Sequence, residues 1–297
     1  MLWICRSFSI NLKRLANFLE PPLAVRVANT LQNRLIRVNE LCEIGHVLIA
    51  GKKIVVVMPA YNASRTLRAA YQRIPREFVD EVLLVDDGSV DGTAELAENL
   101  GIKTVTLPVN KGYGANQKAC YRCSLEMGAD IVVMLHPDYQ YPPELIPAMV
   151  CMLAYGPYDI VLGSRVLVRE ALRGGMPVWK YVSNRVLTSI QNVLWHTNIS
   201  EFHTGFRAFR KTLLETVAFD LNSDDFVFDN QIIAQAVWHG FRIGEISCPT
   251  RYFPEASTIG FRRSLKYAFG VLVTTWDLQM ARFRIRTAAY LGRQRDL

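Results

Sequence analysis

The 297-residue sequence lacks the features that most quickly assign a chain to a class of protein. It has no run of about 20 apolar residues, the length that a membrane-spanning helix requires. The closest stretch, residues 267–283, is short and carries Asp277 and Arg282. Arg6 interrupts the apolar stretch at the start of the chain, and no small-residue cleavage site follows, so we expect no secretory signal. Internal repeats and low-complexity segments are absent as well.

Cysteine is sparse and scattered along the chain. The six cysteines are Cys5, Cys42, Cys120, Cys123, Cys151 and Cys248. Cys120 and Cys123 form a CxxC motif inside a predicted helix, but a zinc site needs a second pair nearby, and none follows. We therefore interpret both as half-buried helix residues. Scattered thiols favour a reducing, cytoplasmic setting.

Positive charge is concentrated at the two ends of the chain, although the net charge is +7 overall. Residues 1–53 carry eight Lys/Arg against three Asp/Glu, and residues 250–297 carry nine against three. The middle carries 17 against 21, so it lacks the basic surface of a nucleic-acid-binding protein, and we expect no nucleic-acid partner. Basic ends around an acidic body are typical of contact with an anionic membrane surface, although two solvated basic helices would give the same pattern.

Half of the residues are hydrophobic, which is enough for a large core. Short apolar runs rich in β-branched residues predict buried strands at Ile54–Met58, Glu81–Val85, Lys103–Leu107, Asp130–Leu135 and Asp159–Gly163. Helical patterns fill residues 64–74, 93–101 and 113–128, and the last two end at a glycine. This alternation predicts an α/β fold with a mostly parallel sheet, in which ligands bind at the carboxyl ends of the strands.

After residue 163 the alternation weakens. We expect helices at residues 178–195 and 226–238, a strand at residues 241–246 and a basic helix from Gly260. The predicted organisation is a helical extension over residues 1–52, one composite domain over residues 53–260 and a basic C-terminal helix over residues 261–297. Within the domain, residues 53–163 would bind a nucleotide and residues 164–260 would bind an acceptor.

Polar motifs follow the first two predicted strands. In MPAYNAS (residues 58–64), Pro59 ends the strand, Tyr61 can stack or hydrogen-bond, and Asn62 or Ser64 can cap the next helix. In VDDGSVDGT (residues 85–93), two carboxylates at a strand end suit contacts with a ribose or a base edge. A plain Asp-Gly turn, with Ser89 or Asp91 as a helix cap, would give the same sequence.

Two further motifs follow the third and fourth strands. NKGYGANQK (residues 110–118) brings two glycines and a lysine to a helix N-terminus, where anions are favoured. It matches neither the GxGxxG fingerprint nor the GK[ST] of a P-loop, and its glycines suit close chain packing equally well. HPDYQYPPELIP (residues 136–147) is either a metal and nucleotide site or a polar turn before a helix that Pro142 and Pro143 open.

In this order and at these intervals, the four motifs resemble the family 2 glycosyltransferases. The pattern is most similar to the branch of dolichyl-phosphate mannosyltransferases and polyprenyl-phosphate glycosyltransferases. The resemblance covers residues 53–260, where GSR (163–165), HTGFRAFRK (203–211) and CPTRYFPEAS (248–257) agree with it. It implies a Rossmann-like GT-A fold, a UDP- or GDP-sugar donor, Mn²⁺ or Mg²⁺, and inversion at the anomeric carbon.

The resemblance also assigns roles to residues. It implies nucleotide binding by Pro59, Tyr61, Asn62, Val85, Asp86, Asp87, Lys111, Gly112, Pro137 and Asp138. It implies metal binding by His136, Asp138 and Gln140, and phosphate or acceptor binding by Arg165, Lys180, Arg207 and Arg251. The catalytic residues would be Asp138, Asp229 and Arg251, with Asp229 as the candidate base.

Four positions depart from the family pattern. An acidic residue is replaced by Ala63, the first metal-motif aspartate by His136, and a helix glutamate by Gln231. A lysine expected near Thr258 is missing, and Arg262, Arg263 or Lys266 are its possible substitutes. His136 can bind the metal, hydrogen-bond a phosphate or cap the turn; an imidazole ligand would shift the preference towards Mn²⁺.

The acceptor determines whether a protein base is needed. A sugar hydroxyl requires one, whereas a polyprenyl phosphate already carries a nucleophilic oxyanion that cations can position. The many cations of the second half therefore favour a lipid-phosphate acceptor and peripheral contact with the cytoplasmic membrane face. There are two alternatives. The chain could transfer the sugar to a hydroxyl of a glycan or glycolipid, or it could be a degenerate protein that binds nucleotide sugars without catalysis. A nucleotidyltransferase would need a glycine-rich loop directly after the first strand, and MPAYNAS has no glycine.

Overall fold

The computed structural model describes residue 49 and residues 51–167, 171–172, 174–250 and 260–294. The chain divides after residue 50, and the fold described below is that of residues 51–297. The predicted helical extension over residues 1–52 therefore lies almost entirely outside the described residues, and Arg251 lies outside them too.

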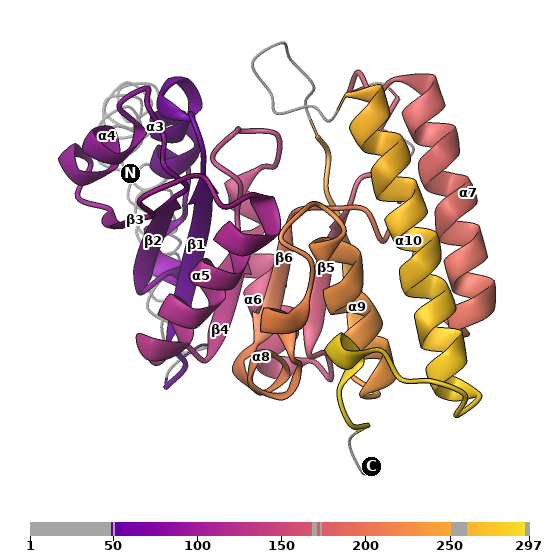
Figure 1. The fold of residues 1–297 in the computed structure, drawn as a ribbon. Helices are drawn as coiled ribbons and strands as arrows, with labels where there is room; N and C mark the ends of the chain where they lie inside the picture. Colours follow the sequence, from indigo (N-terminus) through magenta and orange to yellow (C-terminus); the bar gives the residue numbers. More distant parts are fainter. Residues whose placement is uncertain (1–48, 50, 168–170, 173, 251–259, 295–297) are drawn as a thin grey trace, which may run out of the picture. The chain divides into compact units, whose positions relative to one another are not determined.

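A seven-stranded sheet runs through residues 51–297 in the order β3-β2-β1-β4-β6-β5-β7 (Figure 1). Its strands are β1 (Ile54–Ala60), β2 (Glu81–Asp86), β3 (Lys103–Thr106), β4 (Ile131–Met134), β5 (Ile160–Ser164), β6 (Arg207–Arg210) and β7 (Ile243–Ser247). All pairings are parallel except the two that β6 makes with β4 and β5. The expected mostly parallel sheet is confirmed, but the prediction missed β6.

β1 lies inside the sheet and is buried along its whole length. It pairs in parallel with β2 on one side and β4 on the other, so that Val57 is level with Leu83 and Met134. A strand covered on both faces needs apolar side chains throughout instead of alternation, which explains the continuous run IVVVM. β1 is buried up to its last residue, Ala60, and the loop that follows it begins at the exposed Tyr61.

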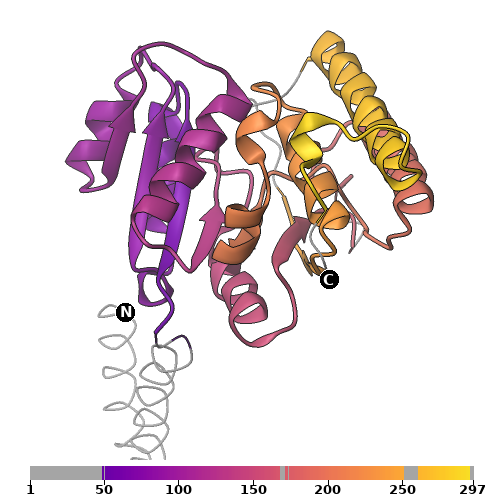
Figure 2. The same ribbon diagram turned by 60° about the horizontal axis from the view of Figure 1, so that its bottom comes forward.

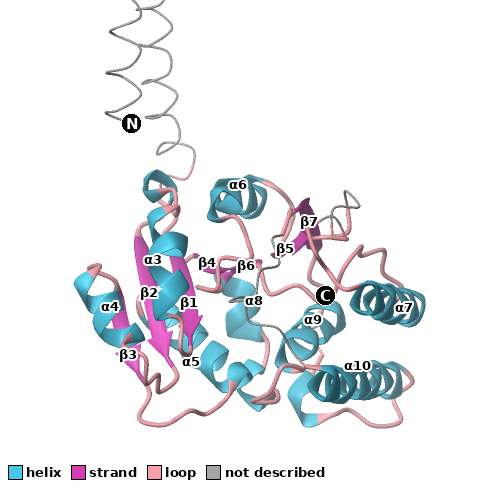
Figure 3. Ribbon diagram, turned by 90° about the horizontal axis from the view of Figure 1, so that it is seen from above, coloured by secondary structure: helices cyan, strands magenta, loops and turns pink. Residues whose placement is uncertain are grey.

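Eight α-helices surround the sheet in the part of the chain that the structure describes. They are α3 (Ser64–Gln72), α4 (Thr93–Asn99), α5 (Tyr113–Glu126), α6 (Ile146–Tyr155), α7 (Val178–Trp195), α8 (Lys211–Thr216), α9 (Phe228–Trp238) and α10 (Phe261–Arg282). α5 packs against β1 and β2, and α6 packs against β4, β5 and β6. α7 and α10 lie side by side at the end of the sheet opposite β3 (Figure 3).

The predicted helix ends are confirmed in part. Gly101 and Gly128 follow α4 and α5 with φ of 72° and 76°, the left-handed conformation expected of a glycine after a helix. Neither Asn62 nor Ser64 caps α3. Instead, Thr93 Oγ1 accepts the N–H of Ala63 (2.8 Å), and Asp91 accepts that of Ser64 (3.0 Å). The first two motifs therefore hold each other in place.

Two further expectations are corrected by the described residues. Cys120 and Cys123 are free thiols on α5 as expected, but Cys120 is fully buried and only Cys123 is partly buried. The C-terminal helix is shorter than expected, because α10 ends at Arg282 and a turn and the short 3₁₀ helix Ala289–Leu291 follow it. None of the described helices combines the length and the apolar character needed to cross a membrane.

Candidate active site

A cavity of about 910 Å³ opens at the edge of the sheet to which β1, β2, β3, β4 and β5 point their carboxyl ends. Its walls are the loops that follow these strands, the segment that enters β6, and the first turns of α7, α9 and α10. Figure 2 shows the ribbon of the same strands and helices from a second direction. The cavity is thus where a parallel α/β sheet is expected to bind its ligand.

The loop after β1 contributes Pro59, Tyr61 and Asn62 to the cavity lining. The Tyr61 side chain is 54% exposed, so its ring is accessible to a planar base. Asn62 has a left-handed backbone (φ 51°), which two bonds support. Its N–H donates to Ser89 Oγ (2.8 Å), and its Oδ1 accepts the N–H of Val90 (3.1 Å).

The two carboxylates after β2 have different positions. Asp87 lines the cavity, and its oxygens accept the backbone N–H groups of Lys111 (2.8 Å) and Gly112 (3.0 Å). Burial raises the pKa of Asp87, and these two bonds oppose that shift. Asp86 is fully buried outside the cavity lining and accepts the N–H of Ser89 (2.9 Å), the arrangement of an Asp-Gly turn. Val85 and the side chain of Lys111 also lie outside the lining.

The start of α5 is packed tightly against the loop at residues 222–224. Gly114 donates its N–H to the carbonyl of Asp224 (2.8 Å), and a Cβ on Gly112 would lie 2.8 Å from that same carbonyl oxygen. Lys118 is buried and forms an ion pair with Asp224 (2.7 Å). Both glycines of NKGYGANQK and its second lysine, Lys118, therefore serve chain packing here, and Gly112 also lines the cavity.

Asp229 of α9 is the centre of a buried polar cluster at the back of the cavity. Its Oδ1 accepts from Gln117 Nε2 (2.8 Å) and lies 3.1 Å from Nη1 of Arg207. Its Oδ2 accepts the hydroxyl of Tyr113 (2.7 Å). Arg207 is completely buried behind Asp229 and outside the cavity lining, because the Asp229 carboxylate compensates the cost of burying its charge.

The same Tyr113 determines which nitrogen of His136 carries the proton. A carboxylate can only accept, so the single hydroxyl proton of Tyr113 is donated to Asp229. His136 Nε2 lies 3.2 Å from the Tyr113 oxygen and must therefore be the donor of that bond. Burial lowers the pKa of His136, which keeps the ring neutral, so the Nδ1 lone pair is the one available to a ligand. Gly205 makes room for the Nε2 edge of the ring.

Asp138 differs from the other carboxylates that line the cavity. Asp87 holds backbone amides, Asp225 pairs with Lys266 (2.6 Å) and Asp229 pairs with Arg207. Asp138 accepts a hydrogen bond from the N–H of Gln140 (3.1 Å) within its own turn. Burial raises the pKa of Asp138, and neighbouring His136 opposes this shift.

The residues of this turn fit a divalent cation that takes part of its coordination from a substrate. Asp138, Gln140 and Pro137 line the cavity beside His136. Among the described residues, no three His, Cys, Asp or Glu side chains form a complete metal site. A carboxylate, an amide and an imidazole nitrogen would leave positions for phosphate oxygens, as Mg²⁺ and Mn²⁺ sites that bind nucleotides commonly do.

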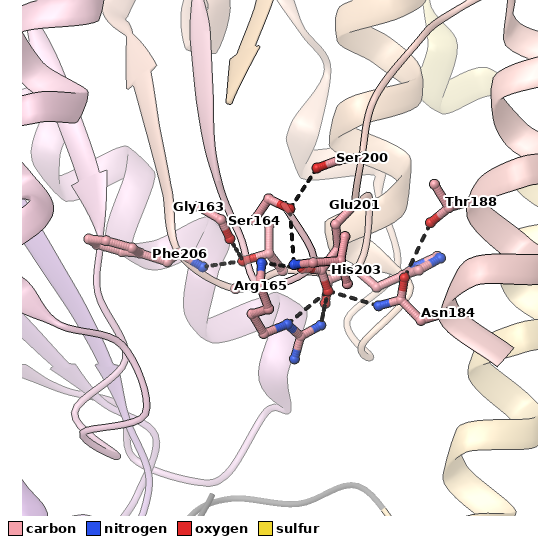
Figure 4. A network of polar contacts seen from close by, with 12 residues as sticks. Gly163, Ser164, Arg165, Asn184, Thr188, Ser200, Glu201, His203 and Phe206 are labelled. Carbon is pink, nitrogen blue, oxygen red and sulfur yellow. Dashed lines mark hydrogen bonds and ion pairs between the residues drawn. The ribbon is translucent and has the colours of Figure 1, made fainter. Parts of the chain in front are cut away.

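After β5, Arg165 lines the cavity and is held by a buried carboxylate (Figure 4). Glu201 is fully buried and accepts from the backbone N–H (2.7 Å) and Nε (2.8 Å) of Arg165 and from Asn184 Nδ2 (2.8 Å). Burial alone would raise the pKa of Glu201, but the charge and hydrogen bonds of Arg165 hold it below its ordinary value. Arg165 is thereby fixed in orientation at the cavity wall.

Further cations reach the cavity from the starts of α7 and α10. Lys180, Arg263 and Lys266 line it, whereas Arg262 does not. Burial, together with the nearby charge of Arg165, lowers the pKa of Lys180. Gln231, the departure on α9, lies outside the lining and accepts the N–H of Ser223 (2.7 Å).

Several lining residues had no role in the sequence-based prediction. They are Tyr113, Asn116, Tyr141, Trp179, His203 and Tyr267. Tyr113, Asn116 and Gln117 follow helical spacing at the start of α5, and that polar face was the available signal. His203 Nδ1 lies 2.8 Å from the hydroxyl of Tyr267, 64 residues away, and nothing in the local sequence indicates this pair.

The fold is shared with solved glycosyltransferases. The crystal structure of glucosyl-3-phosphoglycerate synthase from Mycobacterium tuberculosis is 20% identical, with a TM-score of 0.63, covering 83% of this chain and 85% of that one. That protein has been crystallised with Mn²⁺, UDP and glucosyl-3-phosphoglycerate, and with Mg²⁺ and UDP. The chain described here therefore has the expected GT-A fold.

The family model of glycosyl transferase family 2 matches residues 55–218, more than half of the chain, and the chain therefore belongs to this family. It is a glycosyltransferase, as its motifs predicted. The UDP-N-acetylglucosamine–dolichyl-phosphate N-acetylglucosaminyltransferase of Methanococcus voltae is 25% identical over 221 residues, covering 69% of this chain and 88% of the relative. The low-salt glycan biosynthesis hexosyltransferase Agl6 of Haloferax volcanii is 30% identical over 205 residues, covering 67% and 47%.

Proposed function

We propose that this glycosyltransferase transfers a sugar from a UDP- or GDP-sugar to a polyprenyl phosphate, with a divalent cation and with inversion at the anomeric carbon. The observation that carries the proposal is that one cavity is lined both by the Asp138 turn and by the cations Arg165, Lys180, Arg263 and Lys266. The Asp138 turn would hold the donor, and the cations would hold the acceptor phosphate. The names of the relatives support it, since one acts on dolichyl phosphate and a structural neighbour binds UDP.

On the donor side, Tyr61 would stack on the base, with Pro59 and Asn62 beside it. Asp87 would act mainly through the backbone, because its carboxylate fixes Lys111 and Gly112 and so shapes the loop that faces the nucleotide. Asp86 and Val85 would support this loop from outside the cavity.

The cation would be held by Asp138, Gln140 and the Nδ1 atom of His136. When bound, it supplies a Lewis acid that stabilises the negative charge on the departing nucleotide. Tyr113 would keep His136 in the tautomer that leaves Nδ1 unprotonated, and Asp229 would keep Tyr113 in place. Outer-shell partners of this kind orient metal-binding imidazoles in many proteins.

On the acceptor side, a phosphate oxyanion needs positioning and charge compensation more than it needs a base. Arg165 and Lys180 would supply both from one wall, and Arg263 and Lys266 from another. Asp229 already interacts with three donor groups, Tyr113, Gln117 and Arg207. This favours an organising role for Asp229, whereas transfer to a sugar hydroxyl would require it as the base. Arg251 stays a prediction outside the described residues.

The test is a transfer assay with labelled UDP- and GDP-sugars, Mn²⁺ or Mg²⁺, and two matched acceptors, a polyprenyl phosphate and the same polyprenol without its phosphate. We expect a lipid-soluble labelled product with the polyprenyl phosphate and none with the polyprenol. The anomeric configuration of the product should be opposite to that of the donor. If labelled product forms only with free glycans, the proposed polyprenyl-phosphate acceptor is wrong and a glycan hydroxyl is the acceptor. Calorimetric nucleotide binding without turnover on any acceptor would favour a non-catalytic binding protein.

A further inference from the structure

α7 and α10 form a pair of parallel helices whose starts both lie at the cavity. Lys180 of α7 and Lys266 of α10 line the cavity. At the other end of the pair, the Arg282 guanidinium donates to the carbonyls of Leu194 and Trp195 (both 2.9 Å). The two helices therefore lie side by side along their length, as Figures 1 and 3 show. Each helix also has a face that packs against no described part of the chain.

These outer faces are strongly apolar. On α10 the exposed apolar side chains are Leu265, Phe269, Leu272, Val273 and Trp276, and on α7 they include Val178, Val182, Val186, Ile190 and Val193. Both sets follow the three- and four-residue spacing of one helix face. Phe269 is 68% exposed and Trp276 is 61% exposed. Contiguous exposure of large apolar side chains on this scale indicates an interaction surface.

The charges on the two helices select the kind of partner. α7 contains no Asp or Glu, and the one acid of α10, Asp277, is buried and paired with Arg286 (2.7 Å). The basic residues of the pair are Lys180, Arg185, Arg262, Arg263, Lys266 and Arg282. A second copy of the chain would bring like charges together across such a face. A surface of anionic lipid matches both its charge and its apolar side chains.

The apolar faces also reach the cavity. Trp179 and Leu265 are 42% and 65% exposed, and both line the cavity beside Lys180 and Lys266. We propose that the α7–α10 face lies in the headgroup layer of an anionic bilayer, so that a lipid phosphate enters the cavity between these two helix starts. This deepens the proposed function, on whose lipid-phosphate acceptor it rests. In this arrangement the two helices would lie on the membrane; none of the described helices is long and apolar enough to cross one.

The first test is co-sedimentation of the full chain with vesicles of phosphatidylcholine alone or with phosphatidylglycerol. We expect binding to require the anionic lipid and to weaken with salt. The double variant Phe269→Glu/Trp276→Glu should lose roughly tenfold or more in vesicle affinity, since two large side chains leave the lipid. The matched control is Val90→Glu/Leu221→Glu, which makes the same charge change at exposed apolar side chains away from α7 and α10.

Unchanged vesicle binding by the Phe269/Trp276 variant would overturn the proposal. So would sedimentation velocity in which the wild type is a dimer and this variant is a monomer, because a second copy would then cover the face. A short-chain, water-soluble prenyl phosphate separates the two hypotheses. The variant should keep wild-type transfer to the soluble acceptor and lose transfer to the acceptor embedded in vesicles. If the wild type transfers to neither, the proposed function fails, and vesicle binding still tests the face by itself.

Discussion

The proposed donor and acceptor halves of the cavity are built in different ways. In the donor half, neighbouring loops fix each other through backbone groups and short side chains, such as Asp87 with Gly112 and Asn62 with Ser89. In the acceptor half, buried side-chain charges pair with each other instead. Arg165 pairs with Glu201, and Arg207 pairs with Asp229. Loops that directly follow recognisable strands leave a sequence signal, whereas a buried ion pair between two elements leaves none.

This contrast explains how much of the fold could be predicted. Every parallel strand was expected to within a few residues, and β1, β2, β4 and β5 stand out because a strand buried on both faces must be a continuous apolar run. β3 was expected to be buried as well, but it is an edge strand and is mostly exposed. β6 was missed because RAFR is only four residues long and has just two apolar residues between two arginines, too short for a periodicity to stand out. Its Arg207 is tolerated inside the core only because Asp229 lies beside it.

The same contrast divides the site predictions. The residues around His136, Asp138 and Asp87 could be placed in the cavity because they directly follow strands that were themselves recognised. Arg207 was expected to contact a phosphate, but the structure buries it away from the cavity. The sequence shows that an arginine is present but not which carboxylate it will pair with. Here Asp229 of α9 pairs with Arg207 in the core, so the arginine does not face the cavity.

The largest effect should come from the donor side. Asp138→Asn removes the carboxylate proposed to hold the cation, so we expect transfer to fall about a thousandfold or more, equivalent to roughly 4 kcal/mol of transition-state stabilisation. Steady-state kinetics and thermal unfolding would be measured together. Asp220→Asn, at an exposed surface pair with Arg122, is the control and should keep wild-type rates. Full activity in Asp138→Asn would end the metal assignment.

Loss of a buried charge in the acceptor half should instead lower the free energy of unfolding. Glu201→Gln leaves the Arg165 guanidinium, whose side chain is 11% exposed, without its buried counter-charge. We expect the free energy of unfolding to fall by about 3 kcal/mol in urea denaturation. The matched change in the donor half is Glu144→Gln, which breaks the exposed pair with Arg73 and should cost less than about 1 kcal/mol. Equal losses in the two variants would contradict the contrast between the halves.

Acid should weaken the acceptor half through His203. Burial lowers its pKa from 6.5 to about 4, so the unfolded chain takes up a proton at a pH where the folded chain does not. Its contribution is therefore intact above pH 6.5 and is lost as the pH falls towards 4, by roughly 3 kcal/mol in all. Urea unfolding of wild type and His203→Gln at a series of pH values would isolate it. Parallel curves for the two proteins would refute this assignment.

The smallest expected effect is on Mn²⁺ affinity, in a variant of Tyr113, the residue that connects the proposed donor and acceptor halves. Tyr113 of the donor helix α5 donates to Asp229 of the acceptor helix α9. In Tyr113→Phe, His136 loses the partner that fixes its tautomer, and we expect Mn²⁺ affinity to fall about tenfold. Electron paramagnetic resonance of free Mn²⁺, with nucleotide present, measures this without turnover. Tyr121→Phe removes another buried hydroxyl from the same helix and should leave Mn²⁺ affinity unchanged.

The tight contact between the start of α5 and the loop at residues 222–224 has a consequence for recombination among relatives. Gly112 and Gly114 have no room for a side chain beside Asp224 and Ser223, and Lys118 pairs with Asp224. Residues 110–118 and the loop at residues 222–224, more than 100 residues apart along the chain, must therefore be compatible with each other in sequence. A chimera that takes its acceptor half from another family member should fold only if residues 110–118 are exchanged with it. Crossover points for altering acceptor choice therefore lie outside this pair of segments.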